Sequence, residues 1–145
     1  MGNTMTRIVI DTNVVVSALM SRRGASFRLL SLVGTGQFDI SLSVPLVLEY
    51  EDAAKRWAGS RIALSEQDID DVIDYLCAVA DHHKVYFLWR PMLKDPKDDM
   101  VLELAAGAGC SLIVTHNVSD FQGVERFGIE AIPPQAFLER IGALP

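Results

Sequence analysis

The chain has 145 residues, of which 50% are hydrophobic and 22% are charged, and its formal net charge is -6. This length suits one hydrophobic core of about 100 to 150 residues, and the composition excludes a long disordered or low-complexity protein. The acidic balance argues against the broad basic surface that dominates nonspecific binding to nucleic acids. We therefore expect a single domain over residues 1–145.

The longest apolar runs, such as 8–10 and 42–48, are far shorter than the roughly 20 residues that a membrane-spanning helix needs. The start of the chain is polar and lacks the pattern of a secretory signal. Cys77 and Cys110 both lie in apolar stretches, which favours buried, reduced thiols over a disulfide framework. We expect a cytoplasmic protein with no membrane span.

The first element expected along the chain is a strand that ends at an acid. The run Arg7-Ile-Val-Ile-Asp11 is β-branched and apolar, and Asp-Thr-Asn follows it at once. Such a run is typical of a buried strand that emerges into a loop. Asp11 is therefore predicted at the carboxyl end of the strand.

Helices and strands are expected to alternate after this point. Ser26 and Ser43 are predicted helix caps, and Ser65 with Asp68 has the spacing of a capping box. Pro45 suits a first helical turn, and Gly34 is suited to end a helix. In chain order, we expect helices at 14–20 and 26–33, a strand at 38–42, helices at 44–57 and 65–81, a strand at 85–89, a helix at 98–108, strands at 111–115 and 129–132, and a helix at 136–141.

Strands that are continuously apolar and separated by helices indicate a parallel sheet that is covered on both faces. The predicted fold class is α/β, as a three-layer α/β/α sandwich around four to five parallel strands. In such sheets, ligands bind outside the carboxyl ends of the strands. Asp11 and the loop 115–120 are both expected at this edge.

Two further acids are unusually placed for solvated residues. Glu49 lies in the apolar run 44–49, and Asp98 lies at the start of a predicted helix. Glu49 shares a helix face with apolar neighbours and is expected to point inward. Buried carboxylates that converge would repel one another, whereas a divalent cation would hold them ionised. Oxygen-only ligands select Mg²⁺ or Mn²⁺, and these ions support hydrolysis of phosphodiesters without a covalent protein nucleophile.

The order of these acids resembles a known family. The segments that carry the resemblance are Val-Ile-Asp11-Thr12-Asn13-Val-Val, Leu48-Glu49-Tyr50, Asp95-Pro-Lys-Asp98-Asp99 and Ile-Val-Thr115-His-Asn117-Val-Ser-Asp120. Together they resemble the PIN-domain family over nearly the whole chain, and within it the toxin components of toxin–antitoxin systems. The resemblance implies a metal-dependent ribonuclease that acts on single-stranded or structured RNA, with one or two Mg²⁺ or Mn²⁺ ions.

By position, Asp11, Glu49 and Asp98 match the first three acids of the family. Thr12 and Asn13 match its first motif and are expected to orient Asp11, and Asp99 is a neighbouring acid of lower rank. At the fourth position the family commonly has an aspartate after Thr-Gly, whereas this chain has Thr115-His116-Asn117. Asp120 is the acid that could take this role, because the Asn117 carbonyl can ligate a metal but brings no charge.

The alternative interpretation of each acid is structural. Asp11 could merely cap the next helix, Glu49 could be a surface acid, Asp98 could be a cap, and Asp120 could be a turn residue. Thr115 could position a water or a phosphate, or only bond to the backbone at the strand end.

Other enzyme classes fit less well. Phosphatases of the haloacid dehalogenase kind need a second acid at position 13, where this chain has Asn13. Phospho-receiver domains need paired acids near the first strand and a later lysine. The remaining rival is a degenerate PIN domain that binds RNA or protein without catalysis, and the Asn117 departure leaves this alternative open.

The resemblance also implies partners. A toxin would have an RNA substrate and a small antitoxin protein that buries apolar surface. We further expect a homodimer, for which the predicted helices at 26–33 and 65–80 offer faces.

Overall fold

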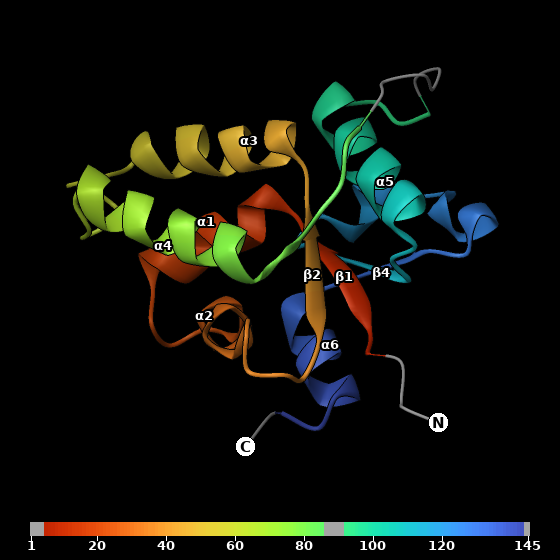
Figure 1. Cartoon of the computed structure of the whole chain (residues 1–145), viewed down its shortest axis with the longest axis horizontal. Helices are drawn as coiled ribbons and strands as arrows, with labels where there is room; N and C mark the ends of the chain where they lie inside the picture. The colour runs from red at the N-terminus through yellow and green to blue at the C-terminus, as the bar shows by residue number, and fades with distance from the viewer. Residues whose placement is uncertain (1–4, 86–91, 144–145) are drawn as a thin grey trace.

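The computed structural model of the protein describes residues 5–85 and 92–143, and Figure 1 shows their arrangement. Five parallel strands form one sheet in the order β3-β2-β1-β4-β5. The strands are β1 (Arg7–Ile10), β2 (Asp39–Leu42), β3 (Asp81–His82), β4 (Leu112–Val114) and β5 (Glu130–Ile132). The predicted α/β class with a parallel central sheet is confirmed.

The middle of the sheet is buried on both faces because its strands are apolar at consecutive positions. Ile8 and Val9 of β1 and Ile113 of β4 are fully buried, as the unbroken apolar runs predicted. Val9 pairs with Ile113 in the parallel register of β1 and β4. This register brings the carboxyl ends of β1 and β4 to the same edge of the sheet.

Helices cover both faces of the sheet, which confirms the three-layer arrangement. In Figure 1, α1 to α4 lie on one side of the strands and α5 on the other, while α6 packs against α2. Phe137 of α6 packs edge to face against Phe38, the residue before β2, with ring centroids 5.2 Å apart. The helices are α1 (Thr12–Met20), α2 (Ala25–Leu32), α3 (Val44–Lys55), α4 (Glu66–Val79), α5 (Pro96–Ala108) and α6 (Pro134–Arg140), with short 3₁₀ turns η1 (Val118–Phe121) and η2 (Val124–Phe127) before β5.

The predicted helix caps are confirmed at two helices and wrong at a third. The Ser43 side chain caps α3, and Ser65 with Asp68 forms the capping box of α4. Gly24 is the N-cap of α2, and Ser26 is buried inside the first turn. Its hydroxyl lies 2.8 Å from Nε2 of His116. The side chain that the local pattern assigned to a cap therefore forms a tertiary hydrogen bond instead.

The predicted third strand at 85–89 is wrong where it can be compared. Residues 86–89 lie outside the described residues, and Val85 is not in a strand. On the side of β2 away from β1, the strand that pairs with it is β3, a short exposed edge strand directly after α4. Its polar sequence Asp81-His82 has none of the apolar pattern on which strand prediction depends.

None of the helices in the part of the chain that the structure describes has the length and apolar character that a membrane crossing requires.

Candidate functional site

A cavity of about 370 Å³ opens at the carboxyl edge of the sheet, where β1 ends and α1, α3 and α5 begin. All four predicted acids, Asp11, Glu49, Asp98 and Asp120, line this cavity, which we call the acid cavity. They come from four separate segments of the chain. The fold therefore brings together the side chains that the sequence singled out.

Asp11 is the most deeply held of the four acids. It is only 7% exposed, and both of its carboxylate oxygens accept hydrogen bonds. Oδ1 accepts from the backbone N–H of Thr12 at 2.9 Å, so Asp11 does cap α1. Oδ2 accepts from the Thr115 hydroxyl at 2.8 Å and from the Asn13 amide at 3.3 Å. Capping and orientation toward the cavity are thus compatible in one side chain.

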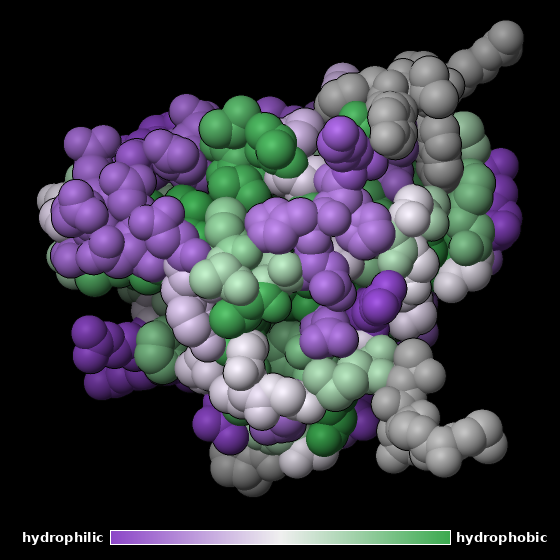
Figure 2. All heavy atoms as spheres, viewed as in Figure 1, coloured by the Kyte–Doolittle hydropathy of each residue, from purple (hydrophilic) through white to green (hydrophobic). Residues whose placement is uncertain are grey.

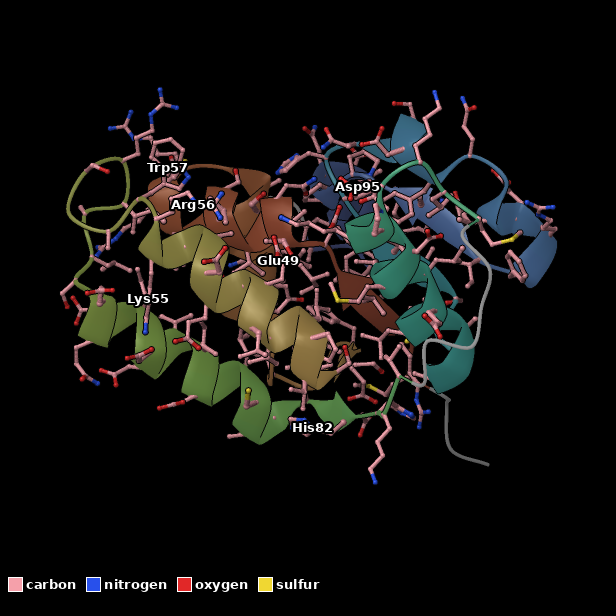
Figure 3. All side chains as sticks on the ribbon, turned by 90° about the horizontal axis from the view of Figure 1, so that it is seen from above. Glu49, Lys55, Arg56, Trp57, His82 and Asp95 are labelled. Carbon is pink, nitrogen blue, oxygen red and sulfur yellow. The ribbon has the colours of Figure 1, made fainter. Side chains whose placement is uncertain are left out.

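Glu49 reaches the cavity because α3 is tied to the end of β1. The buried Tyr50 donates its hydroxyl to the backbone carbonyl of Ile10, the residue before Asp11. The neighbouring Glu49 then points toward α5, and Figure 3 shows it facing the space in which Asp95 lies. Its Oε1 is 3.2 Å from Nζ of Lys97, and its side chain is 19% exposed. The predicted inward orientation fits this placement.

Asp98 projects from the first turn of α5 but does not cap the helix. That role belongs to Asp95, whose side chain accepts from the Lys97 N–H at 2.9 Å, with Pro96 in the first turn. The alternative interpretation of Asp98 as a cap is therefore wrong. Asp99 accepts the N–H groups of Met92 and Leu93 through Oδ1, at 3.0 Å and 2.9 Å, and does not line the acid cavity.

The segment after β4 supplies the fourth side of the cavity. Thr115 is fully buried. Its hydroxyl oxygen accepts a hydrogen bond from the Asn117 N–H at 3.0 Å, and the hydroxyl donates a hydrogen bond to Asp11. Both Asn117 and Asp120 line the cavity, the second from η1. Thr115 thus links this loop to Asp11, and the side-chain Oδ1 of Asn13 accepts a hydrogen bond from the backbone N–H of His116 at 3.2 Å.

Burial and neighbouring acids raise the affinity of Asp11 and Asp98 for protons. Burial raises the pKa of Asp11 above its usual value; hydrogen bonds from Thr115 and Thr12 lower it, and the charges of Asp120 and Glu49 raise it further. Burial and then the charge of Asp11 raise the pKa of Asp98 to about 6. The negative charge at this edge is therefore incompletely compensated by the chain's own groups.

This donor set fits a hard divalent cation in its chemistry. The converging ligands are all oxygens, and their repulsion is of the kind that a bound Mg²⁺ or Mn²⁺ relieves. In the described residues, however, no three acidic, histidine or cysteine side chains are already arranged to hold one ion. Binding would therefore require side chains to move within the cavity. Glu49 would have to leave its ion pair with Lys97 to reach the ion.

Three polar residues that line the cavity were not predicted as site residues. Asp95 and Lys97 lie in the Asp-Pro-Lys-Asp-Asp segment that carried the resemblance, but only its later acids were assigned roles. Ser17 lines the cavity one helical turn after Asn13. Its position on the same face of α1, four residues after Asn13, is the signal that could have identified it.

Comparisons with known proteins bear on the fold and the family of the chain. Among curated proteins, none matches the chain. Among solved structures, the fold is similar to that of a chain in the crystal structure of VapBC2 from Rickettsia felis bound to a DNA fragment from their promoter. That match has a TM-score of 0.55 and 12% sequence identity, and it covers 87% of this chain and 97% of the other. A family model described as the PIN domain matches residues 7–119. The chain therefore belongs to the PIN-domain family.

Proposed function

We propose that this PIN domain is a metal-dependent endoribonuclease and the toxin of a toxin–antitoxin pair. The observation that carries the proposal is the acid cavity, in which four carboxylates from separate segments meet at the sheet edge. Mg²⁺ or Mn²⁺ is the proposed cofactor. RNA, single-stranded or structured, is the proposed substrate.

Within this proposal, Asp11, Glu49, Asp98 and Asp120 would hold the ion or ions. A bound ion would lower the pKa of a coordinated water and stabilise charge on the leaving oxygen. Thr115 and Asn13 fix the orientation of the Asp11 carboxylate through their hydrogen bonds. Lys97 brings a positive charge to the wall of the cavity, where it can meet a phosphate once Glu49 turns to an ion.

The decisive test is cleavage of single-stranded RNA with Mg²⁺ or Mn²⁺ by the wild type and by Asp11→Asn. Asparagine can still cap α1 but removes the central charge, so cleavage should fall by at least about a hundredfold in a folded variant. Asp120→Asn and Asn117→Asp, measured beside it, show which residue completes the set. Wild-type cleavage that persists in excess chelator would overturn the metal mechanism.

A noncatalytic PIN domain that binds RNA or protein is the second candidate. Two observations favour it: Asn117 stands where the family commonly has an acid, and no three ligands are preassembled in the described residues. This candidate predicts RNA affinity without cleavage under any divalent ion, so the same assay separates the two.

The proposed antitoxin would need an apolar surface, and the structure offers one. A groove of about 500 Å³ lies between α1, α2 and α4, lined by residues that include Leu19, Met20, Phe27 and Tyr75. Phe27 is 37% exposed and Tyr75 is 50% exposed. A small protein that inhibits cleavage by covering this groove should lose inhibition against Tyr75→Arg, and undiminished inhibition would exclude the groove.

A further inference from the structure

A second cavity, of about 800 Å³, lies beside α2, and its charged lining residues are basic although the whole chain has a negative net charge. Arg22, Arg23 and Arg28 line it, and all three are exposed. Among the described residues that line it, none is an aspartate or a glutamate. We call this feature the arginine groove.

The absence of acids from the groove is unusual in a chain with 19 acidic and 13 basic residues. In the described part of the chain, ion pairs engage four other basic residues, and none of them includes an arginine of the groove. The three guanidinium groups therefore keep their positive charge available to a ligand. The acids in those ion pairs are Glu51, Asp70, Asp52, Glu49 and Glu130, and none of them lines the arginine groove.

The other lining groups suit a nucleotide chain. Gln37 and Gln135 add amide groups, and Phe27 is an exposed aromatic ring on which a base can stack. Guanidinium groups bind phosphate oxygens through paired N–H donors. The groove thus combines positive charge, hydrogen-bond donors and an aromatic surface within a few residues.

The arginine groove begins where one wall of the acid cavity ends. Asn13, Ser17 and Met20 line the acid cavity along one face of α1, and the Ser21-Arg22-Arg23 segment follows directly. α1 has nine residues, which at 1.5 Å per residue makes it about 14 Å long. A single strand that is cut at the acids and lies along α1 would reach Arg22 and Arg23 within a few nucleotides.

We propose that the arginine groove binds backbone phosphates of the single-stranded RNA whose scissile bond lies at the acid cavity. This inference rests on the proposed ribonuclease function and extends it to a second contact region. It places the nucleic-acid affinity of an acidic protein in one local groove. The adjoining groove between α1, α2 and α4 is apolar and suits a protein better than a phosphate chain.

The test compares RNA binding by two triple variants in an Asp11→Asn background, where the probe is not cut. The first variant is Arg22→Gln/Arg23→Gln/Arg28→Gln. The matched control is Arg56→Gln/Arg126→Gln/Arg140→Gln, which loses the same charge from arginines that already bond to Asp52, to the Gly123 carbonyl or to Glu130. The probes are a fluorescein-labelled oligouridine long enough to pass both cavities and a uridine dinucleotide, read by anisotropy and by competition.

The first variant should bind the long oligouridine at least about tenfold more weakly, with a plot of log K against log salt shallower by about two. Its affinity for the dinucleotide should not change, because that probe cannot reach the groove. The control should keep its affinity for both probes within about twofold. Circular dichroism on both variants establishes that they are folded.

Equal loss of affinity in both triple variants would overturn the proposal, because net charge alone would then explain it. Unchanged affinity of the first variant, or a larger effect on duplex DNA or an acidic peptide than on the oligouridine, would also overturn it. The two proposals fail separately. Absence of cleavage in the wild type defeats the ribonuclease, whereas arginine-independent RNA binding defeats the groove alone.

Discussion

At the scale of single residues, the site depends on how Asp11 is held. Its carboxylate is nearly enclosed, yet hydrogen bonds from Thr12, Thr115 and Asn13 occupy its oxygens. Those bonds favour the charged form, while burial and neighbouring acids disfavour it, and the raised pKa shows that the second group of effects prevails. For Asp98, burial and the charges of neighbouring acids all raise the pKa.

Asp98 should make the stability of the metal-free protein depend on pH. Its pKa is about 6 in the folded protein and 3.8 ordinarily, so the folded state binds the proton more tightly. The free energy of unfolding should therefore fall as the pH rises from about 4 through about 6. Asp98→Asn should remove this loss. Its free energy of unfolding, measured by urea denaturation at about pH 7, should exceed that of the wild type by about 1 kcal/mol after allowance for solvent screening.

At about pH 2 the advantage of Asp98→Asn should vanish, because the wild-type carboxyl is then protonated in both the folded and the unfolded state. Asp74→Asn, which removes an exposed acid from α4 and leaves Asp98 in place, serves as the control and should keep the pH dependence of the wild type. A gain of equal size at both pH values would show that electrostatic repulsion is not its cause.

At this scale the sequence predicted which acids would meet but not all of their neighbours. Asp11, Glu49 and Asp98 stand out because each sits where a solvated acid is unusual, beside apolar residues or at a strand end. Asp95 and Lys97 line the same cavity but look like ordinary helix-start residues, because a cap and a solvated base are common there. Only the approach of α5 to α3 gives Lys97 its partner.

At the scale of elements, the buried strands and amphipathic helices could be predicted because burial imposes a pattern on the sequence. β3 could not, since a two-residue edge strand is fixed by backbone pairing with β2 and not by apolar side chains. The prediction of Ser26 as the cap of α2 was wrong for a related reason. A residue about 90 positions away, His116, binds Ser26, and no local pattern contains that information.

From the sequence we expected self-association through the helices at 26–33 and 65–80, but the most exposed large apolar side chains of the described residues lie on α3, which we now propose as the dimer surface. Its inner face buries Leu46, Tyr50 and Ala54, whereas Val44 and Leu48 on the outer face are 72% and 58% exposed. Figure 2 shows apolar side chains reaching the surface over the first half of this helix. Exposed apolar neighbours of this kind are typical of a protein interface.

Leu48→Glu should therefore shift the protein from dimer to monomer in sedimentation equilibrium without loss of stability, because the side chain makes no core contact. Val79→Glu, at a 40% exposed apolar position of α4, is the matched control and should leave the mass unchanged. A wild type that is monomeric at all concentrations would refute the interface, and a control that dissociates the dimer would move it to α4.

At the scale of the whole molecule, the charge is divided between two regions. The chain carries a net charge of -6, and part of that excess gathers at the acid cavity, while the arginine groove holds uncompensated positive charge. Net charge alone argued against a nucleic-acid partner. The spatial separation of the charges removes that objection, because a bound cation would neutralise one region and phosphates the other.

The last prediction follows from that division, because an ion bound only by the folded state stabilises the whole molecule. If Mn²⁺ binds the acid cavity, the free energy of unfolding rises by about 2.7 kcal/mol when the free ion exceeds its Kd about a hundredfold. For a chain of this size, Tm should increase by roughly 5 to 10 °C. Asp11→Asn should abolish the increase and Asp74→Asn should preserve it, as measured by calorimetry. An increase that survives in Asp11→Asn would mean that Mn²⁺ binds the acidic surface at large and that the cavity is not its site.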